Sequence, residues 1–587
     1  MSGKVIVIGG GLAGLMSVIK LAERGQKVDL FSLVPCKRSH SVCAQGGINA
    51  AVNTKGEGDS TWEHFDDTIY GGDFLANQTP VKNMIEAAPS IIYLMDRMGV
   101  QFNRTPEGFL DVRRLGGAKY SRTVFAGATT GQQLIYALDE QVRRYEDEGL
   151  VTRYEEWELL SLVRDDEGCC RGAVVQDMKS LDIQVFPADA VILATGGPGM
   201  IYVRSTNSTI NTGFAAASAY MQGATYANGE FVQIHPSAIP GRDKLRLMSE
   251  SIRGDGGRVW VYKDGKPWYF LEDWYPAYGN MVPRDIATRA IFKVCVDMKL
   301  GVEGENKVYL DITHLDPHDI DRKLAGVVDI YEKFIGDDPR KVPMETFPAV
   351  HYSMGGLWVD YNQMTNIPGL FAAGECEYQY HGANRLGGNS LVAAIYAGMV
   401  VGPKAFEYSN GLKQRCNDLP GSLFGRAKEE EIIKQKALFA MQGKENPYKL
   451  HQELGEWMVD NVTVVRNNDR LLATDQKIQE LMERYRTIGV GNGAEWGNQI
   501  VPFTRRLWGM LSLARVITLG AYHRNESRGA HYKPDYPDRD DENWLKTTKA
   551  EWTANGPRFS YDPVDTSFIK PRKRRYDVAK EVTVQNV

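Results

Sequence analysis

Long hydrophobic runs are absent from this 587-residue chain. A helix that crosses a bilayer needs about 20 consecutive apolar residues. The apolar stretches 5–22 and 391–401 are interrupted by glycine and charged residues or are too short. We therefore expect no membrane-spanning helix, and any membrane attachment should come through a partner. The first predicted strand begins almost at the N-terminus, so no signal or transit peptide is expected.

Cysteine is also scarce. The chain has seven cysteines, an odd number, and no Cys-x-x-Cys pair. This usage predicts free thiols in a reducing compartment, with the adjacent Cys169 and Cys170 in a surface turn. Without such a pair to hold zinc or an iron-sulfur cluster, electron transfer through metal clusters would need another subunit.

A large net charge is missing as well. The formal net charge is -5, so no long-range field favours nucleic acid or acidic lipid. We expect the one basic cluster, residues 570–575, to be a solvated tail or a subunit contact rather than a nucleic-acid arm. What remains is the composition of an ordinary globular protein, 43% hydrophobic and 24% charged, long enough for several domains.

The N-terminus has the pattern of a nucleotide-binding βαβ unit. The expected elements are a buried strand Lys4–Ile8, a tight turn 9–14, a helix Leu15–Arg24 and a second strand Lys27–Ser32. Gly9, Gly11 and Gly14 in the turn would let a pyrophosphate approach the N-terminus of the helix. Ser32 stands where an acid usually binds the ribose of NAD, which favours FAD over NAD.

Two later strands also end in glycine-rich turns. Ala190–Ala194 is followed by Thr195-Gly196, and Gly369–Ala373 is followed by Gly374-Glu375. The helix Asn389–Val401 follows a glycine-rich loop, and its dipole would place partial positive charge beside a reduced flavin. An ordinary buried helix with a polar cap is the other interpretation, and both can hold because they use the same amides.

The order of these signals predicts the domain organisation. Nucleotide-fold signals occur early and again late, which implies a domain inserted between them. From Lys404 to Gly520 the pattern is helical, with amphipathic stretches 427–442 and 471–487. The polar, proline-rich remainder is expected to be irregular. The predicted fold class is α/β, comprising a discontinuous Rossmann-like FAD-binding domain (1–232 and 351–403), an inserted α+β domain (233–350), a helical domain (404–520) and a small C-terminal domain (521–587).

Several histidines and arginines have ordinary explanations when each is taken alone. His235 and His351 each lie at the edge of a strand-like segment, where a structural histidine is more common than a ligand. Glu250 and Arg253 would meet one helical turn apart, as surface ion pairs do. Arg284 has the position of a helix-start arginine beside a capping acid.

Taken together, these residues belong to a recognisable set of motifs. The motifs are, in order, RSHSVCAQGG, HPSAIPG, SESIRGDGG, PRDIATR, HYSMGG, AAGE and HGANRLGGNSL, followed by RNESRGAH and PDRDDENW. The set closely resembles the flavoprotein subunit of succinate dehydrogenase and fumarate reductase. The resemblance extends from Lys4 to about Leu545, and its two longest motifs, HGANRLGGNSL and PDRDDENW, are highly specific.

The resemblance implies FAD covalently bound through His40 and chemistry that interconverts succinate and fumarate. A flavin linked through an imidazole is a stronger oxidant, which suits a saturated dicarboxylate. The implied FAD-binding residues are Gly9, Gly11, Gly14, Ser32, Ser39, His40, Gln45, Gly46, Gly47, Thr195, Gly196, Glu375, Asn389, Ser390 and Leu391. Phe214 and Leu115 depart from the family pattern, in which Asp and Phe, respectively, are common at these positions. The effect of the two departures on flavin potential and substrate packing stays open.

The resemblance also implies roles in catalysis. Arg385 and His351 would bind one substrate carboxylate. His235 and Ser249 would bind the other and twist it out of conjugation; relatives commonly have Thr in place of Ser249. Arg284 would transfer the proton, and this is reasonable only if Glu250 and Arg253 relay protons to it, because an arginine has a pKa above about 12.

Partners follow from the same resemblance. An iron-sulfur subunit would dock on this chain, and membrane anchor subunits with quinone would lie beyond it, at the cytoplasmic face of the cell membrane. Any iron-sulfur cluster or haem would belong to those partners. The inserted domain would be a cap that supplies Ser249, Glu250, Arg253 and Arg284 and closes over the dicarboxylate about hinges near Gln233 and Pro348.

The sequence has two rival interpretations. L-aspartate oxidase shares the fold and much of the dicarboxylate pocket, but it binds FAD noncovalently, and His40 and the RNESRGAH motif favour the quinone-linked enzyme. A noncatalytic electron-transfer flavoprotein would not need the proton relay formed by Arg284, Glu250 and Arg253. Gln45 beside the flavin favours succinate oxidation, although the preferred direction stays open.

Overall fold

A five-stranded parallel sheet organises the part of the molecule that carries the N-terminus. The computed structural model describes residues 3–241, 245–491 and 493–577. The strand order is β19 (Leu370–Ala372), β10 (Ala190–Leu193), β1 (Val5–Ile8), β2 (Val28–Ser32) and β6 (Val151–Glu155). Every neighbouring pair is parallel, so the carboxyl ends of these strands meet at one edge. In open parallel sheets ligands bind at this edge.

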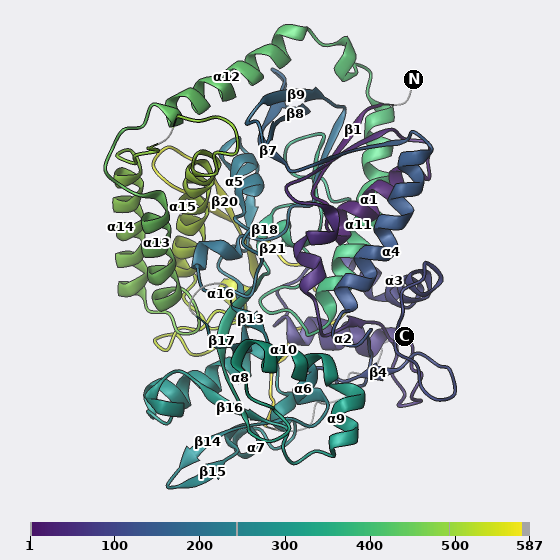
Figure 1. The fold of residues 1–587 in the computed structure, drawn as a ribbon, viewed down its shortest axis with the longest axis vertical. Coiled ribbons are helices and arrows are strands. Elements are labelled where there is room, and N and C mark those ends of the chain that lie inside the picture. The colour runs from purple at the N-terminus through teal and green to yellow at the C-terminus, as the bar shows by residue number, and fades with distance from the viewer. Residues whose placement is uncertain (1–2, 242–244, 492, 578–587) are drawn as a thin grey trace.

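Three helices cover this sheet and its edges: α1 (Leu12–Ala22), α4 (Thr130–Asp147) and α11 (Asn389–Gly411) (Figure 1). Helix α1 begins at Leu12 rather than at the expected Leu15, because Gly11 already serves as its N-cap. Helix α11 continues ten residues beyond the expected end at Val401. Its Gly398 packs so closely on α1 that a Cβ there would lie 2.6 Å from the carbonyl oxygen of Ala13.

A three-stranded antiparallel sheet follows β6 in the chain. It consists of β7 (Trp157–Arg164), β8 (Cys170–Asp177) and β9 (Ile183–Pro187). The prediction of a surface turn at Cys169 and Cys170 is wrong for the second residue, because Cys170 begins β8 and is buried. A smaller sheet joins β3 (Ile48–Asn49), β5 (Thr123–Val124) and β4 (Val112–Arg113).

Residues between Val232 and Ser353 build a six-stranded antiparallel sheet in the lower part of Figure 1. Its strand order is β13 (Arg246–Leu247), β12 (Val232–Ile239), β17 (Met344–Ser353), β16 (Val308–Asp311), β14 (Arg258–Lys263) and β15 (Lys266–Trp268). The helices of this segment are α6 (Ser251–Gly254), α7 (Phe270–Trp274), α8 (Arg284–Phe292), α9 (Pro317–Lys323) and α10 (Ala325–Ile335). The long pair β12–β17 joins the segment to the rest of the chain, and we call this segment the cap.

The rest of the chain contains long helices and one late hairpin. The helices are α12 (Gly421–Phe439), α13 (Pro447–Asn461), α14 (Asn468–Tyr485) and α15 (Ile500–His523). The expectation of an irregular C-terminal region is wrong for β20 (Lys546–Glu551) and β21 (Arg558–Pro563). These strands extend a sheet with β11 (Tyr226–Ala227) and β18 (Gly356–Leu357), a pairing with distant segments that local composition does not reveal.

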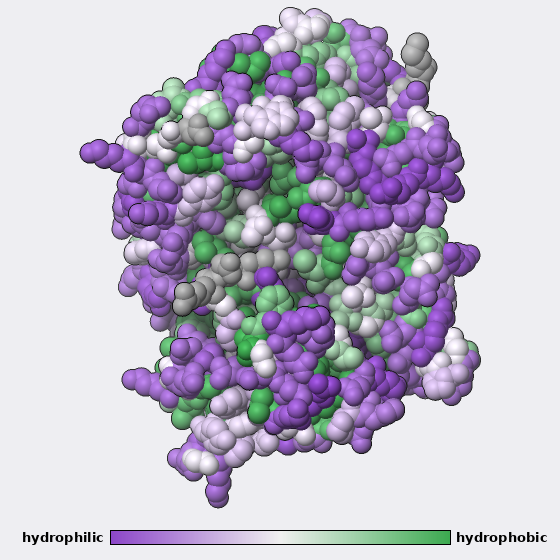
Figure 2. Space-filling view, viewed as in Figure 1, coloured by the Kyte–Doolittle hydropathy of each residue, from purple (hydrophilic) through white to green (hydrophobic). Residues whose placement is uncertain are grey.

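The molecular surface and the basic cluster complete this description. On the face drawn in Figure 2, hydrophilic residues dominate the rim and hydrophobic residues gather toward the middle. For residues 570–575 we expect a solvated tail or a subunit contact, and this is wrong for Arg574, which is buried in ion pairs with Asp73 and Asp285 of the same chain. Within the described ranges, no helix is long and apolar enough to cross a membrane.

Candidate active site

A cavity of about 550 Å³ lies at the carboxyl edge of the parallel sheet. It is lined by the turns after β1 and β10, by residues of the 39–47 segment and by the start of α11. Thirteen of the fifteen expected FAD-binding residues line it: Gly9, Gly11, Ser32, Ser39, His40, Gln45, Gly46, Gly47, Thr195, Gly196, Glu375, Ser390 and Leu391. Segments far apart in the sequence thus form one cavity.

The other two expected residues, Gly14 and Asn389, do not line this cavity. Gly14 lies in the first turn of α1, where a Cβ would sit 1.8 Å from the carbonyl oxygen of Gly9. Its absent side chain therefore lets the helix start next to the turn. The buried side chain of Asn389 accepts a hydrogen bond from Asn49, pairs with the ring of His64, and donates to the hydroxyl of Thr68.

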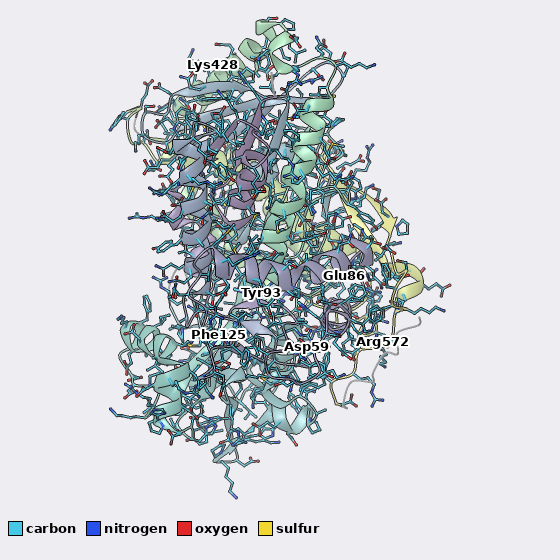
Figure 3. All side chains as sticks on the ribbon, turned by 90° about the vertical axis from the view of Figure 1, so that its right-hand side faces the viewer. Asp59, Glu86, Tyr93, Phe125, Lys428 and Arg572 are labelled. Atoms are coloured by element: carbon cyan, nitrogen blue, oxygen red, sulfur yellow. The ribbon has the colours of Figure 1, made fainter. Side chains whose placement is uncertain are left out.

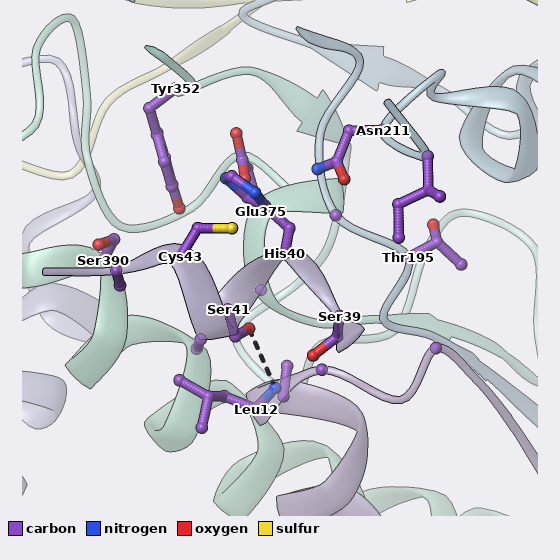
Figure 4. A pocket seen from close by; sticks show the side chains of 18 of the residues that line it. Leu12, Ser39, His40, Ser41, Cys43, Thr195, Asn211, Tyr352, Glu375 and Ser390 are labelled. Carbon is purple, nitrogen blue, oxygen red and sulfur yellow. Dashed lines mark hydrogen bonds between the residues drawn. The ribbon is translucent and has the colours of Figure 1, made fainter. Parts of the chain in front are cut away.

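The turn after β1 depends on its glycines. Gly9 has a φ of +120°, and a Cβ there would lie 2.1 Å from the carbonyl oxygen of Ala194. Gly11, the N-cap of α1, has no side chain to cap the helix. The amide of Leu12 instead donates to the hydroxyl of Ser41 at 3.4 Å, drawn as the dashed line in Figure 4. The positive end of α1 is therefore presented to the cavity.

Four buried polar atoms on the cavity wall fit a large polar cofactor. Ser39 Oγ, Gln45 Oε1, Thr195 Oγ1 and Asn211 Nδ2 are buried without a hydrogen-bond partner in the described protein. A buried polar atom usually has a partner, because leaving it unpaired costs about 1–3 kcal/mol. Figure 4 shows Ser39, Thr195 and Asn211 on one side of His40, and Cys43 and Tyr352 on the other. The residues present fit the expected FAD.

His40 is oriented by a segment that sequence reasoning did not single out. The amide of Ser208 donates to Nδ1 of His40 at 3.1 Å, and Asn207 Nδ2 lies 3.4 Å from its Nε2. Asn207, Ser208 and Asn211 belong to the loop between β10 and α5 (Phe214–Met221). In this region the sequence motifs point only to Phe214, a departure from the family pattern, and not to these three residues.

Arg284 and Arg385 meet at a shared neutral acceptor beside the cavity. Gln233 Oε1 accepts from Arg284 Nη1 at 2.9 Å and from Arg385 Nη2 at 3.0 Å. Gln233 Nε2 donates to Asn384 Oδ1 and to the carbonyl oxygen of Arg385, which fixes the orientation of the amide. The sequence predicts only a hinge near Gln233, because nothing in its sequence context marks it as a contact of both arginines.

Arg385 has no carboxylate within ion-pair distance among the described residues. Its guanidinium lies over the ring of Tyr352, and its Nε is buried without a partner in the described protein. Burial, together with the positive charge of Arg284, lowers the pKa of Arg385 to about 9. A buried guanidinium whose charge is not balanced by a nearby carboxylate of the described chain is suited to bind an anionic ligand.

Glu250 joins Arg284 to Arg253 in one buried network. Glu250 Oε2 accepts from Arg284 Nη2 at 2.7 Å and from Nε at 2.9 Å, while Oε1 accepts from Arg253 Nη2 at 2.7 Å. Although burial favours its protonated form, the charges of Arg284 and Arg253 hold the pKa of Glu250 at about 2. The expected trio is therefore a connected ion network and not a surface pair.

The two expected histidines lie together next to this network. The rings of His235 and His351 are 5.0 Å apart, and burial, followed by the charge of Arg284, holds both pKa values well below the usual range. Both rings are thus neutral. His351 Nδ1 pairs with the hydroxyl of Thr206 at 2.7 Å, while His235 Nε2 is buried without a partner in the described chain.

Of the expected catalytic and substrate residues, Arg284, His351 and Arg385 line the cavity itself. His235, Glu250 and Arg253 touch these three or one another, one step behind the wall. Ser249 is buried and its hydroxyl pairs with that of Ser251 at 2.8 Å, so its side chain is occupied within the cap. The two departures from the family pattern, Leu115 and Phe214, also line the cavity.

Comparisons with known proteins cover nearly the whole chain. The model of the FAD binding domain matches residues 4–391, and that of the fumarate reductase flavoprotein C-term matches residues 451–576. The succinate dehydrogenase flavoprotein subunit of Bacillus subtilis is 68% identical over 578 residues, which is 98% of this chain and 99% of that protein. The fumarate reductase flavoprotein subunit of Escherichia coli is 33% identical, over 97% of this chain and 95% of that protein.

A solved structure gives the same result. The flavoprotein of Escherichia coli quinol fumarate reductase superposes on this fold with a TM-score of 0.93. Its sequence identity is 31%, and the match covers 99% of this chain and 100% of that chain. At this identity and coverage the likeness concerns family as well as fold.

Proposed function

Since this chain belongs to the family of succinate dehydrogenase and fumarate reductase flavoprotein subunits, which use FAD to interconvert succinate and fumarate, we propose residue roles for that reaction. The observation that carries the proposal is the sharing of Gln233 Oε1 by Arg284 and Arg385 at the wall of the cavity. Because the acceptor that they share is neutral, the two guanidiniums keep positive charge that can bind a dicarboxylate.

One substrate carboxylate binds to Arg385 and His351. The planar fork of Arg385 can grip a carboxylate through two parallel hydrogen bonds. His351, neutral because of its burial, can donate from Nε2 in the tautomer whose Nδ1 accepts from the hydroxyl of Thr206. His235 and Ser249 bind the other carboxylate, a role supported by the unpartnered Nε2 of His235, which can donate in the tautomer whose Nδ1 accepts from the amide of Ser237. Binding there requires the hydroxyl of Ser249 to exchange Ser251 for substrate.

Arg284 moves the proton at the substrate carbon. When bound, FAD supplies the acceptor of the hydride in oxidation and its donor in reduction. During oxidation Arg284 passes a proton to Glu250 and, as the neutral guanidine, accepts a proton from the succinate carbon; during reduction its guanidinium gives a proton to the substrate carbon and is reprotonated by Glu250. Glu250 and Arg253 carry that proton onward, a relay supported by the hydrogen bonds that connect the three side chains. Exclusion of water from this buried network strengthens each charge interaction.

His40 forms the covalent bond to FAD through Nε2. The amide of Ser208 donates to Nδ1 at 3.1 Å, a closer contact than the 3.4 Å between Asn207 Nδ2 and Nε2, and this favours Nε2 for the link. An imidazole attached to the flavin withdraws electrons and raises its potential, which suits the oxidation of a saturated dicarboxylate. Gln45, also on the cavity wall, favours the same direction.

The cap closes over the substrate about hinges near Gln233 and Pro348. Support comes from the β12–β17 ladder, whose register is irregular between Gln233 and Ile234 and between His235 and Ala238. An iron-sulfur subunit docks on the flavoprotein and passes electrons to quinone in membrane anchor subunits, which place this chain at the cytoplasmic face of the cell membrane. Any cluster or haem lies in those partners.

Two substitutions test the proposal. In denaturing electrophoresis, flavin fluorescence should stay with the wild-type band and disappear with His40→Ser, which should lose succinate oxidation and keep some fumarate reduction. A fluorescent His40→Ser band would disprove the attachment site. Arg284→Lys should retain FAD and lose turnover in both directions. Normal turnover of this variant would rule out proton transfer by Arg284.

A further inference from the structure

The C-terminal segment 565–577 returns to the start of α3 (Gln78–Arg97) after the hairpin β20–β21. Asp565 accepts hydrogen bonds from the amide and the hydroxyl of Thr79, at 2.9 and 2.6 Å. The side-chain carbonyl of Gln78 accepts from the amides of Phe568 and Ile569, at 2.9 and 2.7 Å. Ile569 is buried. The segment is thus built into the molecule and is not a loose tail.

The same segment continues along α2 (Thr61–Gly71). Arg572 Nη2 donates to both carboxylate oxygens of Asp66 at 2.8 Å, and its guanidinium lies over the ring of Tyr70. Figure 3 shows Arg572 below the level of Glu86 on α3, in the zone where the N-terminal helices approach the cap. These contacts anchor the segment to the FAD-binding part of the chain.

Two further residues of the segment reach the cap. Arg574 Nη1 lies 2.9 Å from Asp285 Oδ2 in the cap and 3.2 Å from Asp73 Oδ2 next to α2. The ring of Tyr576 lies 5.2 Å from that of Tyr278 in the cap and 5.7 Å from that of Tyr70 in α2. The segment therefore connects the two parts through one buried cation and one buried ring.

Asp285 follows Arg284 directly in the first turn of α8. Its side chain is 1% exposed and that of Arg574 is 8% exposed, so removal of Arg574 leaves the buried carboxylate of Asp285 without this ion-pair partner. Asp285 Oδ1 also accepts from Asn384, the residue before Arg385, at 3.1 Å. A shift of Asp285 would therefore move the start of α8, which carries Arg284, relative to Arg385.

We propose that Arg574 is a positioning residue for the reaction. Through its ion pairs with Asp285 and with Asp73, next to α2, it holds the start of α8 in place, and Arg284 is the first residue of that helix. This inference rests on the proton-transfer role of Arg284 in the proposed function. It assigns to the basic C-terminal cluster an intramolecular task. The pair bridges 289 positions of sequence, so only the folded chain can form it.

The test uses the FAD-loaded chain with its partner subunits and compares Arg574→Ala with Arg575→Ala. Arg575 removes the same charge from the same segment, but it pairs with the exposed Asp577. Arg574→Ala should lower kcat for succinate oxidation by on the order of tenfold to hundredfold, since small misplacements of a catalytic group have this effect. KM and flavin content should change less than about twofold. Arg575→Ala should behave as wild type, and Arg574→Lys should restore part of kcat.

Hydrogen–deuterium exchange supplies a readout independent of turnover. The amides of α8 should exchange faster in Arg574→Ala than in wild type or Arg575→Ala. Unchanged α8 exchange and unchanged kcat in Arg574→Ala, or equal effects of both alanine variants, would overturn the proposal. If Arg574→Ala does not fold, Asp285→Asn removes the same ion pair and is judged by the same two readouts.

The outcomes separate this inference from the proposed function. A wild-type complex without succinate or fumarate turnover would refute the proposed function, while the exchange comparison would still report whether Arg574 holds α8. An active complex with faster α8 exchange and normal kcat would leave the proposed function intact and refute the positioning role.

Discussion

Glu250 uses a single carboxylate oxygen to hold two nitrogens of Arg284: Oε2 lies 2.9 Å from Nε and 2.7 Å from Nη2. Its other oxygen holds Arg253 at 2.7 Å. All three side chains are buried, so one anion balances two cations away from water. This arrangement fixes the guanidinium plane of Arg284 and leaves net positive charge at the site.

Glu250→Gln should therefore lose turnover while it retains FAD. The amide keeps the shape of the side chain but removes the negative charge between two buried guanidiniums, and loss of one partner from a buried pair costs about 3–5 kcal/mol. Steady-state kinetics should show kcat reduced by on the order of a hundredfold or more, as for loss of a group in proton transfer. Urea unfolding should show the lower stability.

Glu250→Asp is the control for charge. It keeps the carboxylate but shortens the side chain, so it should recover stability more than turnover because it cannot reach both arginines with the same geometry. A Glu250→Gln variant that is as active and as stable as wild type would contradict this account of the network.

Features that depend on local backbone constraints could be predicted from the sequence. The Gly9, Gly11 and Gly14 pattern marks a turn that only glycine can build, because Cβ atoms at Gly9 and Gly14 would collide with carbonyl oxygens. The parallel strands on either side of it were also expected, and the structure places them in one sheet with β10 and β19.

Long-range polar contacts could not be predicted in this way. The residues next to Gln233 do not mark it as part of the site, because its two contacts, Arg284 and Arg385, lie 51 and 152 positions away in the sequence. Arg574 looks like part of a solvated basic tail until Asp73 and Asp285 enclose it. Motif resemblance named the arginines of the site, but only the fold shows which neutral side chain they share.

Gln233→Glu should weaken dicarboxylate binding. The substitution is nearly isosteric, but it places a carboxylate between Arg284 and Arg385, where the proposed substrate carboxylate needs their charge. The KM for succinate and the inhibition constant of malonate should rise by on the order of tenfold or more, since charged hydrogen bonds contribute about 1.5–3 kcal/mol. Thermal unfolding should show stability that is unchanged or higher, because the new charge compensates two buried cations.

A stability loss with unchanged malonate binding would contradict the prediction for Gln233. Gln233→Leu separates charge from hydrogen bonding, because it removes the acceptor of both guanidiniums without adding a negative charge. It should destabilise the fold and change the malonate inhibition constant less than Gln233→Glu does.

Asn389 and Ser390 should have separable effects although they are adjacent at the start of α11. The side chain of Asn389 is hydrogen-bonded to Asn49 and Thr68 and paired with His64, so Asn389→Ala should lower the free energy of unfolding by about 2–4 kcal/mol. Ser390 lines the cavity, so Ser390→Ala should weaken FAD retention with little loss of stability. Urea unfolding and flavin content measure the two effects, and identical profiles for both variants would contradict the assignment.

Glu377 should make the protein less stable as the pH rises. Burial raises the pKa of this carboxyl to about 8 in the folded chain, against the hydrogen bond from the amide of Gln379 that lowers it, while its ordinary value is 4.5. Between these values the unfolded chain has lost the proton and the folded chain retains it, so stability falls as pH increases from 4.5 toward 8. From pH 5 to pH 8 this loss amounts to at most about 4 kcal/mol.

Glu377→Gln tests this prediction because the amide cannot ionise and can still accept from Gln379. Urea unfolding of the variant and of wild type at pH 5 and pH 8 should show a smaller stability loss in the variant at the higher pH. Burial raises the pKa of Glu375 to about 7, so that residue contributes the same trend to both proteins and cancels in the comparison. Equal changes in the two proteins would mean that Glu377 is ionised in the folded state, and its burial would then have to be compensated by a cation absent from the described chain.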